Sequence, residues 1–285
     1  MTTKRPHVLN GARVAAEGDS ATRVRAVERA GQIVTALAEH PYPMGIVELA
    51  HRVQLSPGSV HRLLATLIRI GWVEQNLRTA KYRLGTRMLG IGTTALITNP
   101  VIQHGKTYIA QLSASTGHDA LLSTLVGLRA VYLARTAGVH GRLEFEPGVS
   151  QPAHAMADGK MLLTYLPEEE RRYLYGTEGL RRYTDRTITD PEELEKELDK
   201  IRKQGYATDD SERIDGVRSV AVPVLDHDGR ATLAMLSLVT ADTPPEEDVA
   251  LAKRMLTMAR EFSDQLQMIG DMPMPAVDFA RYNLE

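Results

Sequence analysis

The most informative part of this chain is residues 46–84, IVELAHRVQLSPGSVHRLLATLIRIGWVEQNLRTAKYRL. Their apolar spacing predicts a short helix, a turn at Gln54 and Leu55, a second helix, and then two short strands around a basic loop. This order is typical of a winged helix-turn-helix, a module that places its second helix in the major groove of DNA. The alternative is a small helical domain that binds protein, but the glycine stop and the basic hairpin after the capped helix favour DNA.

The second helix of this segment has clear signals at both ends. Ser56 is a good N-cap, Pro57 occupies the first helical position, and Gly71 ends the helix. The apolar residues of the helix share one face, so the opposite face is free to contact DNA. Because the N-terminal part of such a helix reaches base edges, we predict four base-reading candidates: Ser59, His61, Arg62 and Thr66.

Other residues of the segment are predicted to contact the phosphate backbone. Arg78 and Lys81 lie in the basic hairpin, where they would add affinity without reading sequence. Ser56 and the free N–H groups at the start of the helix can also hold a phosphate. The expected partner of residues 46–84 is therefore double-stranded operator DNA.

Charge is distributed unevenly along the chain. Residues 1–90 contain 13 Lys and Arg against 6 Asp and Glu, whereas the remaining residues contain 21 against 30. A basic N-terminal third joined to an acidic remainder indicates that a polyanion binds at one end only. Chance segregation of solvated charges is the alternative, because an excess of 7 positive charges is modest.

Composition and motifs argue against several classes of protein. There are no cysteines, which excludes disulfides and thiolate metal sites and fits a reducing cytoplasm. No run approaches the ~20 apolar residues that span a bilayer, and the N-terminus carries no secretory signal. The 9 histidines lack metal-ligand spacing, and no nucleophile elbow or phosphate-binding loop is present. We therefore predict a cytoplasmic protein with no cofactor and no catalytic site.

The rest of the chain mixes helices and strands. One strand pair is predicted around the turn at Gly127, and a second around the turn that ends at Gly229. Asp190 and Pro191 begin a helix that Gly205 ends. An antiparallel sheet flanked by helices is an α+β fold. The other predicted elements are helices near 101–115 and 246–268 and strands near 120–126, 130–137, 220–225 and 231–239.

Several strings of residues carry a family resemblance. LAHRVQLSPGSVHRLLATL at 49–67, GWVE at 71–74 and HAMADGK at 154–160 resemble the IclR family of bacterial transcription regulators, and the resemblance covers residues 25–270. It implies a winged helix-turn-helix, a linker helix and a GAF-like antiparallel-sheet domain that binds an effector. Many family members have Lys or Arg where this chain has Gly58, so the operator preference does not carry over.

The sequence and the resemblance together imply five segments. A disordered N-terminal arm at 1–21 is followed by the winged helix-turn-helix domain at 22–84 and a linker helix at 85–99. The effector-binding domain covers 100–270, and residues 271–285 form a C-terminal tail. The linker helix of the family packs between subunits, so a homodimer or a homotetramer is expected.

The effector site follows from the same resemblance. The turn Ala157-Asp158-Gly159 is expected to begin a helix whose free N–H groups hold a carboxylate. The remaining candidates that the resemblance implies are the polar residues Asp209, Ser219 and Ser237, and His140 and Leu143 of a covering segment. Each has an alternative interpretation: Asp209 can cap a turn, His140 can lie on the surface, and Ser219 and Ser237 can belong to the core of the sheet.

Three positions depart from the family pattern. Ser219 stands where members often have Cys, and near Val239 they often have a second Ser or Gly. Asp158 occupies a turn in which small residues are common. Its carboxylate would repel an anionic ligand unless it faces away or pairs with a donor. These departures weigh against a simple carboxylate and leave the effector unidentified.

The function that these features predict is sequence-specific transcription regulation, with repression favoured over activation. A small organic or aromatic metabolite bound in the C-terminal domain is expected to change operator affinity. Two alternatives remain open, a DNA-binding oligomer without an effector and a metabolic enzyme with a fused helical domain. A metabolite panel that never changes the melting temperature would favour the first alternative, and turnover of a bound ligand would favour the second.

Overall fold

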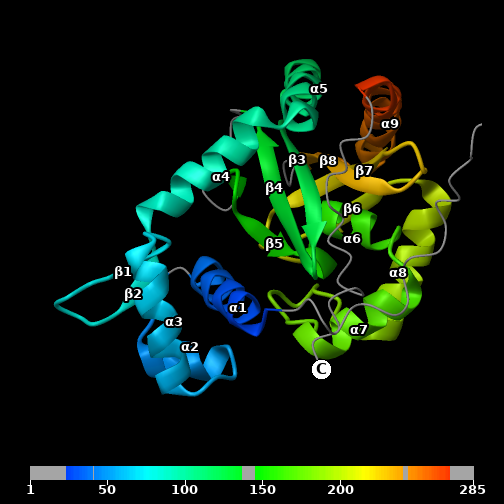
Figure 1. The fold of residues 1–285 in the computed structure, drawn as a ribbon. Helices are drawn as coiled ribbons and strands as arrows, with labels where there is room; N and C mark the ends of the chain where they lie inside the picture. The colour runs from blue at the N-terminus through cyan, green and yellow to red at the C-terminus, as the bar shows by residue number, and fades with distance from the viewer. Residues whose placement is uncertain (1–23, 41, 137–144, 240–242, 270–285) are drawn as a thin grey trace, which may run out of the picture. The chain divides into compact units, whose positions relative to one another are not determined.

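The computed structural model describes residues 24–40, 42–136, 145–239 and 243–269. The chain divides into two compact units, Met1–Ile91 and Gly92–Glu285, whose helices and strands are labelled in Figure 1. The division falls inside a helix, α4 (Thr86–Thr98), and each unit is described by itself. No helix among the described residues combines the length and the apolar character that crossing a bilayer requires.

The described part of the first unit consists of three helices followed by a hairpin. The helices are α1 (Arg25–Glu39), α2 (Ile46–Arg52) and α3 (Pro57–Arg69), and the strands are β1 (Val73–Gln75) and β2 (Tyr82–Leu84). Ser56 caps α3 and Pro57 is its first residue, as the sequence predicts. The predicted order of a winged helix-turn-helix is confirmed. Its core draws on every one of these elements and includes Ile33, Met44, Leu49, Val60, Leu64, Val73 and Tyr82.

Backbone constraints fix the turn and the hairpin of this unit. Gln54, between α2 and α3, has φ +52°, a left-handed conformation that is uncommon for residues other than glycine. Met44 exchanges backbone hydrogen bonds of 2.9 and 2.8 Å with Tyr82, so the segment before α2 is tied to β2. A Cβ on Gly85 would lie 2.4 Å from the backbone oxygen of Gly71, so only glycine fits where the hairpin ends.

The described part of the second unit is built on an antiparallel sheet of six strands, in the order β5-β4-β3-β8-β7-β6. β3 and β8 pair at the centre, with Ser123 opposite Ala234 and Asp119 opposite Leu238. The predicted α+β fold with an antiparallel sheet is confirmed. The strands are β3 (Asp119–Val126), β4 (Arg129–Arg135), β5 (Ser150–Pro152), β6 (Ala207–Asp210), β7 (Arg218–Leu225) and β8 (Ala231–Val239).

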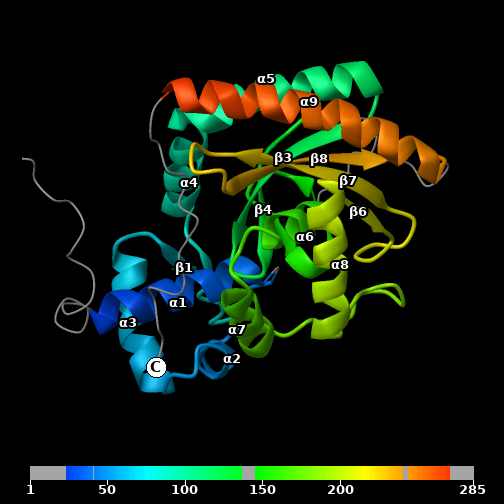
Figure 2. The same ribbon diagram turned by 90° about the vertical axis from the view of Figure 1, so that its right-hand side faces the viewer.

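Helices cover both faces of this sheet, as Figure 2 shows. After α4, the α-helices in the described part of this unit are α5 (Pro100–Thr116), α6 (Ala157–Leu163), α7 (Glu168–Glu178), α8 (Pro191–Gln204) and α9 (Pro245–Ile269). α5 and α9 pack on one face, where Leu122 and Met235 belong to their core. α6 crosses the other face, with α8 packed against it, and Leu121 and Leu236 belong to that core. Neighbouring residues of a strand therefore point to different helices.

Candidate nucleic-acid interface and ligand-binding face

The outward face of α3 presents three of the four predicted base-reading side chains. His61, Arg62 and Thr66 are exposed, because the apolar residues of α3 occupy the opposite, buried face. Ser59 is half-buried, and its hydroxyl accepts a hydrogen bond of 3.0 Å from the Ser56 hydroxyl. The Ser56 oxygen also accepts from the Ser59 N–H at 3.3 Å. Ser59 therefore forms part of the helix cap. The side chains of His61 and Arg62 are free to reach a groove, whereas the exposed Thr66 hydroxyl donates to the Arg62 carbonyl at 3.4 Å.

The loop between β1 and β2 carries the two predicted phosphate-binding cations, Arg78 and Lys81, and both are exposed. Asn76 fixes the start of this loop, since its Oδ1 accepts hydrogen bonds from the backbone N–H groups of Arg78 (2.9 Å) and Thr79 (3.1 Å). The Ala80 N–H donates to the Asn76 carbonyl at 2.8 Å, and Ala80 has φ +55°. Local hydrogen bonds thus shape the loop that presents both cations.

The cations of the first unit differ in whether they are paired. Arg52 and Arg83 form ion pairs with Glu39 (3.3 Å) and Glu74 (3.0 Å). Unpaired cations are the ones most available to DNA phosphates, because no carboxylate competes for them. Within the described part of this unit, no carboxylate lies at ion-pair distance from Arg62, Arg69, Arg78 or Lys81.

Glu74 has a positioning role that the sequence analysis did not identify. Its carboxylate accepts hydrogen bonds from the Thr86 N–H (2.9 Å), from the Thr86 hydroxyl (2.8 Å) and from Arg83. The bonds from Thr86, and then that from Arg83, lower the pKa of Glu74. Thr86 is the first residue of α4, so Glu74 joins the hairpin to the start of that helix. The sequence offered no signal, because the partners lie nine and twelve residues away.

Buried polar side chains gather where α6 crosses the sheet. Asp158 of α6, Ser123 of β3 and Tyr132 of β4 are fully buried, and Ser123 and Tyr132 are opposite each other in the sheet register. The carboxylate oxygens of Asp158, Ser123 Oγ and the Tyr132 hydroxyl have no hydrogen-bond partner among the described residues. We call Asp158, Ser123 and Tyr132 the polar cluster. Each unsatisfied buried group costs about 1–3 kcal/mol, which a bound molecule with matching donors and acceptors would offset.

The ionisation of the polar cluster follows from its burial. Burial raises the pKa of Asp158 to about 6, and the nearby Ser123 hydroxyl and the N–H groups of Gly159 and Asp158 itself act against this rise. The Ser123 hydroxyl is close enough for this effect but does not have hydrogen-bonding geometry. Burial and the charge of Asp158 raise the pKa of Tyr132 well above its ordinary value. At pH 7.5 Asp158 is mostly an acceptor, and Tyr132 keeps its proton.

Asp209 and Ser219 lie together on the same face of the sheet as the polar cluster. They are opposite each other in the β6–β7 register, and the Ser219 hydroxyl donates to Asp209 Oδ2 at 3.2 Å. The Glu212 N–H donates to Asp209 Oδ1 at 2.9 Å. Burial and the Glu212 charge raise the pKa of Asp209 to about 7, and Lys160, paired with Glu212 at 2.5 Å, opposes the rise. The structure therefore brings together two of the polar residues that the resemblance implies.

Ser237 lies on the opposite face of the sheet. It pairs in register with Ala120 and Val220, which belong to the core under α5 and α9. Its neighbours Leu236 and Leu238 face α6 instead, and Leu238 is opposite Ser219. Because side chains alternate along a strand, Ser237 faces α5 and α9 while its two neighbours face α6. The structure does not bring Ser237 together with Asp158, Asp209 or Ser219.

The remaining effector candidates divide between α6 and the covering segment. Ala157 is the first residue of α6, as the sequence predicts, and it is fully buried. Gly159 allows α6 to pack closely, since a Cβ there would lie 2.3 Å from the Ala153 Cα. His140 and Leu143 lie outside the described residues.

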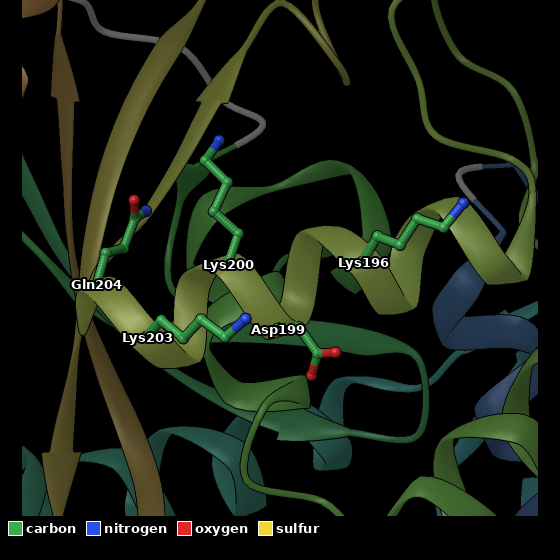
Figure 3. A pocket seen from close by; sticks show the side chains of 5 residues that line it. All are labelled: Lys196, Asp199, Lys200, Lys203 and Gln204. Atoms are coloured by element: carbon green, nitrogen blue, oxygen red, sulfur yellow. The ribbon is translucent and has the colours of Figure 1, made fainter.

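A depression on the outer face of α8 involves none of the predicted residues (Figure 3). Its lining side chains recur at helical spacing and project from one side of the helix, so they form an ordinary solvated helix face. Two are already paired, Lys200 with Glu197 (3.4 Å) and Asp199 with Arg202 (2.5 Å). Among the described residues, no group of His, Asp and Glu side chains could hold a metal ion. The lining residues are Lys196, Asp199, Lys200, Lys203 and Gln204.

Both units match models of one protein family. The model described as Bacterial transcriptional regulator IclR C-terminal matches residues 93–266. The IclR helix-turn-helix domain matches residues 26–77. The chain is also similar to the HTH-type transcriptional regulator XynR of Escherichia coli strain K12, with 34% identity over 248 residues that cover 87% of this chain and 94% of XynR.

Solved structures show the same likeness. An IclR transcriptional regulator from Alicyclobacillus acidocaldarius has a TM-score of 0.69 and 29% identity, covering 86% of this chain and 99% of that chain. An IclR homologue from Microbacterium hydrocarbonoxydans, solved in complex with 4-hydroxybenzoate, has a TM-score of 0.63 and 20% identity. It covers 85% of this chain and 98% of that chain, and at this identity the likeness concerns the fold alone.

Proposed function

Because the chain belongs to the IclR family of DNA-binding transcription regulators, we propose that a small organic metabolite bound between α6 and the sheet changes its operator affinity. The family models and the relatives identify a transcription regulator rather than an enzyme. The proposed domains are the DNA-binding domain at 22–84, the linker helix at 85–99 and the effector-binding domain at 100–270. Residues 1–21 and 271–285, the proposed arm and tail, lie outside the described residues.

The DNA-binding domain uses two sets of side chains in this proposal. His61, Arg62 and Thr66 read base edges from the outward face of α3, with Ser59 beside them at the cap. Arg78 and Lys81 hold phosphates from the hairpin loop, and Ser56 holds one at the start of α3. The exposure of the first set and the unpaired state of the cations support these roles.

The polar cluster is the observation that carries the effector proposal. Its unpartnered atoms come from three different elements, β3, β4 and α6, and they lie on the face that also holds Asp209 and Ser219. Buried polar groups in folded proteins are nearly always hydrogen-bonded, so such a convergence favours a ligand. The complex of an IclR homologue with 4-hydroxybenzoate supports a small-molecule effector in this fold. Ala157 lies at the start of α6 beside this site, whereas Ser237 is left out of it.

The apolar character of α4 supports a homodimer or a homotetramer as the functional form. None of its residues is buried in the described chain, although it carries exposed Leu89, Ile91 and Ile97. A surface helix with this composition is best explained by contact with another apolar surface. A second copy of the chain would also supply the second DNA-binding domain that a symmetric operator needs.

In this proposal the protein represses transcription in the cytoplasm, where operator DNA is found. Energetically, the effector must bind one arrangement of the paired DNA-binding domains more tightly than another. The test is a mobility-shift assay on the DNA upstream of the protein's own gene, at several salt concentrations and with a metabolite panel. Binding that prefers no sequence would contradict operator recognition, and affinity that no metabolite changes would contradict effector control.

A further inference from the structure

The polar cluster has a hydrogen-bonding pattern that specifies the chemistry of its ligand. Asp158 provides two buried carboxylate oxygens that accept no hydrogen bond of good geometry from the described residues, although the Ser123 hydroxyl and the N–H groups of Gly159 and Asp158 itself lie close by. Ionised carboxylate oxygens accept hydrogen bonds and never donate them. The part of the ligand that faces Asp158 must therefore present hydrogen-bond donors.

Ser123 and Tyr132 narrow the class of donor. Both hydroxyls are buried and unpartnered, and each can donate one hydrogen bond and accept others. An ammonium group only donates, so it could bond to Asp158 and to both hydroxyl oxygens, but the protons of Ser123 and Tyr132 would find no acceptor on the ligand. Hydroxyl groups both donate and accept, so adjacent hydroxyls on one small molecule match all three side chains.

The charges on this face exclude a carboxylate at the same position. Lys160 is buried and paired with Glu212 at 2.5 Å. Arg213 donates to Gln151 at 2.9 Å and lies 4.3 Å from the centre of the Tyr183 ring. These two cations are already engaged, so an anionic group placed against Asp158 would meet a like charge in a buried setting. Any carboxylate that the ligand carries must lie away from Asp158.

We propose, on the basis of the effector function above, that the site selects a polyhydroxylated small molecule whose adjacent hydroxyl groups donate to Asp158 and bind Ser123 and Tyr132. Sugars, polyols and sugar acids share this chemistry. Leu121, Leu236 and the Tyr132 ring lie on the same face and provide apolar contacts for the C–H groups of such a molecule. Asp158 is then the specificity-determining residue of the site.

The test is a titration of the full-length protein, by calorimetry and by thermal shift, with three groups of probes. The first holds neutral sugars and polyols (D-glucose, D-ribose, sorbitol), and the second holds sugar acids (D-gluconate, D-ribonate). The third holds pyruvate, benzoate and butylammonium, which lack adjacent hydroxyls. We expect binding in the first or second group and none in the third, and the first two arms distinguish a neutral ligand from an acidic one. Binding confined to the third group, or binding by no probe, overturns the proposal.

Variants locate the recognition in the polar cluster. Asp158→Ala is expected to weaken binding of the best probe by roughly tenfold or more, because hydrogen bonds to a charged group are lost. Asp158→Asn keeps the shape and one acceptor, so a smaller loss is expected, and it serves if the alanine variant does not fold. Ser123→Ala should weaken binding several-fold. Ser237→Ala is the matched control, because Ser237 Oγ is also buried and unpartnered but lies on the opposite face. Equal effects of the two serine variants, or unchanged binding to Asp158→Ala, overturn the proposal.

The same probes separate this inference from the proposed function in a mobility-shift assay. A polyhydroxylated probe that binds through Asp158 but leaves operator affinity unchanged would contradict effector control and leave the ligand class intact. Benzoate that changes operator affinity, in a protein that binds no polyhydroxylated probe, would uphold effector control and overturn the ligand class.

Discussion

Arg62 and Arg78 are both exposed and unpaired cations of the first unit, yet they lie on different kinds of backbone. Arg62 projects from the outward face of a regular helix whose start is fixed by Ser56 and Pro57. Arg78 lies in a loop held by Asn76. A helix fits the major groove and can place a guanidinium against a base edge, whereas a loop beside the groove meets phosphates.

We therefore expect different losses from Arg62→Ala and Arg78→Ala. Arg62→Ala should weaken operator binding by roughly 1–3 kcal/mol while leaving binding to unrelated DNA almost unchanged. Arg78→Ala should weaken binding to both DNAs and lower the salt slope by about one unit. Titrations of operator and unrelated DNA at several salt concentrations measure both effects. Indistinguishable behaviour of the two variants would mean that the roles assigned here are wrong.

Asp158 gives the second unit a pH-dependent stability. Its pKa rises from 3.8 to about 6 on folding because of burial, so the folded state holds the proton more tightly than the unfolded chain. The carboxyl group therefore costs nothing below about pH 4, and stability falls as pH rises from 4 to 6, by about 2–3 kcal/mol. Asp209, which faces Glu212, Lys160 and Ser219, extends the decline to about pH 7.

Asp158→Asn is expected to stabilise the protein at pH 8 by up to about 2 kcal/mol and to have little effect at pH 4. The reason is that the variant has no charge to bury at the higher pH. Urea denaturation at the two pH values measures the difference. Asp215→Asn is the control, because Asp215 is exposed and its replacement should act equally at both pH values. A gain from Asp158→Asn that is the same at pH 4 and pH 8 would contradict the argument.

The elements differ in how well their sequences predict them. α3 and α8 are well predicted, since a capping side chain and a proline begin each and a positive-φ glycine follows each. β8 has the predicted bounds, Ala231–Val239, because a turn precedes its apolar run. The prediction missed β5, β6 and α7. β6 has the sequence ATDD, poor in strand formers, and its pairing with distant β7 makes it a strand.

The DNA-binding face of α3 and the polar cluster also differ in how well the sequence predicts them. The interface candidates of α3 come from one continuous amphipathic helix, and their exposure is predictable from its period. The polar cluster joins β3, β4 and α6, and no local pattern relates Ser123 to Asp158. Ser123 and Tyr132 were missed for this reason, although a serine and a tyrosine within adjoining apolar strands are an available signal. The resemblance implies Ser237, and only the sheet register reveals which face it occupies.

α4 allows a prediction at the scale of one element. A double substitution, Leu89→Glu with Ile97→Glu, should leave each unit folded, because both residues are exposed and lie outside the described cores. If α4 packs against a second copy, the variant should shift to a smaller species in light scattering and lose roughly tenfold or more in operator affinity. Ala95→Glu is the control, because Ala95 is exposed and lies on the opposite side of the helix from Leu89 and Ile97. An unchanged mass for the double variant would contradict the role of α4.

The whole molecule joins a basic DNA-binding unit to an acidic sheet unit within one helix, α4. A regulator built in this way obeys linkage, so the effector and the operator change each other's affinity by the same factor. We expect operator DNA to change the Kd of the effector by the factor by which the effector changes the Kd of DNA. Paired titrations, with and without saturating partner, measure both factors. Factors that differ beyond error would show that the two ligands do not act on a single equilibrium.

The central pairing of β3 with β8 has a consequence for synthesis of the protein. It joins residues as far apart as Asp119 and Leu238, whereas the first unit ends at Ile91. Strands that are far apart in the sequence pair slowly, and they cannot pair until both have left the ribosome. The first unit can then fold completely before all strands of the sheet have been synthesised. A chain whose synthesis stops before β8 would therefore carry a complete winged helix-turn-helix beside an unfinished sheet.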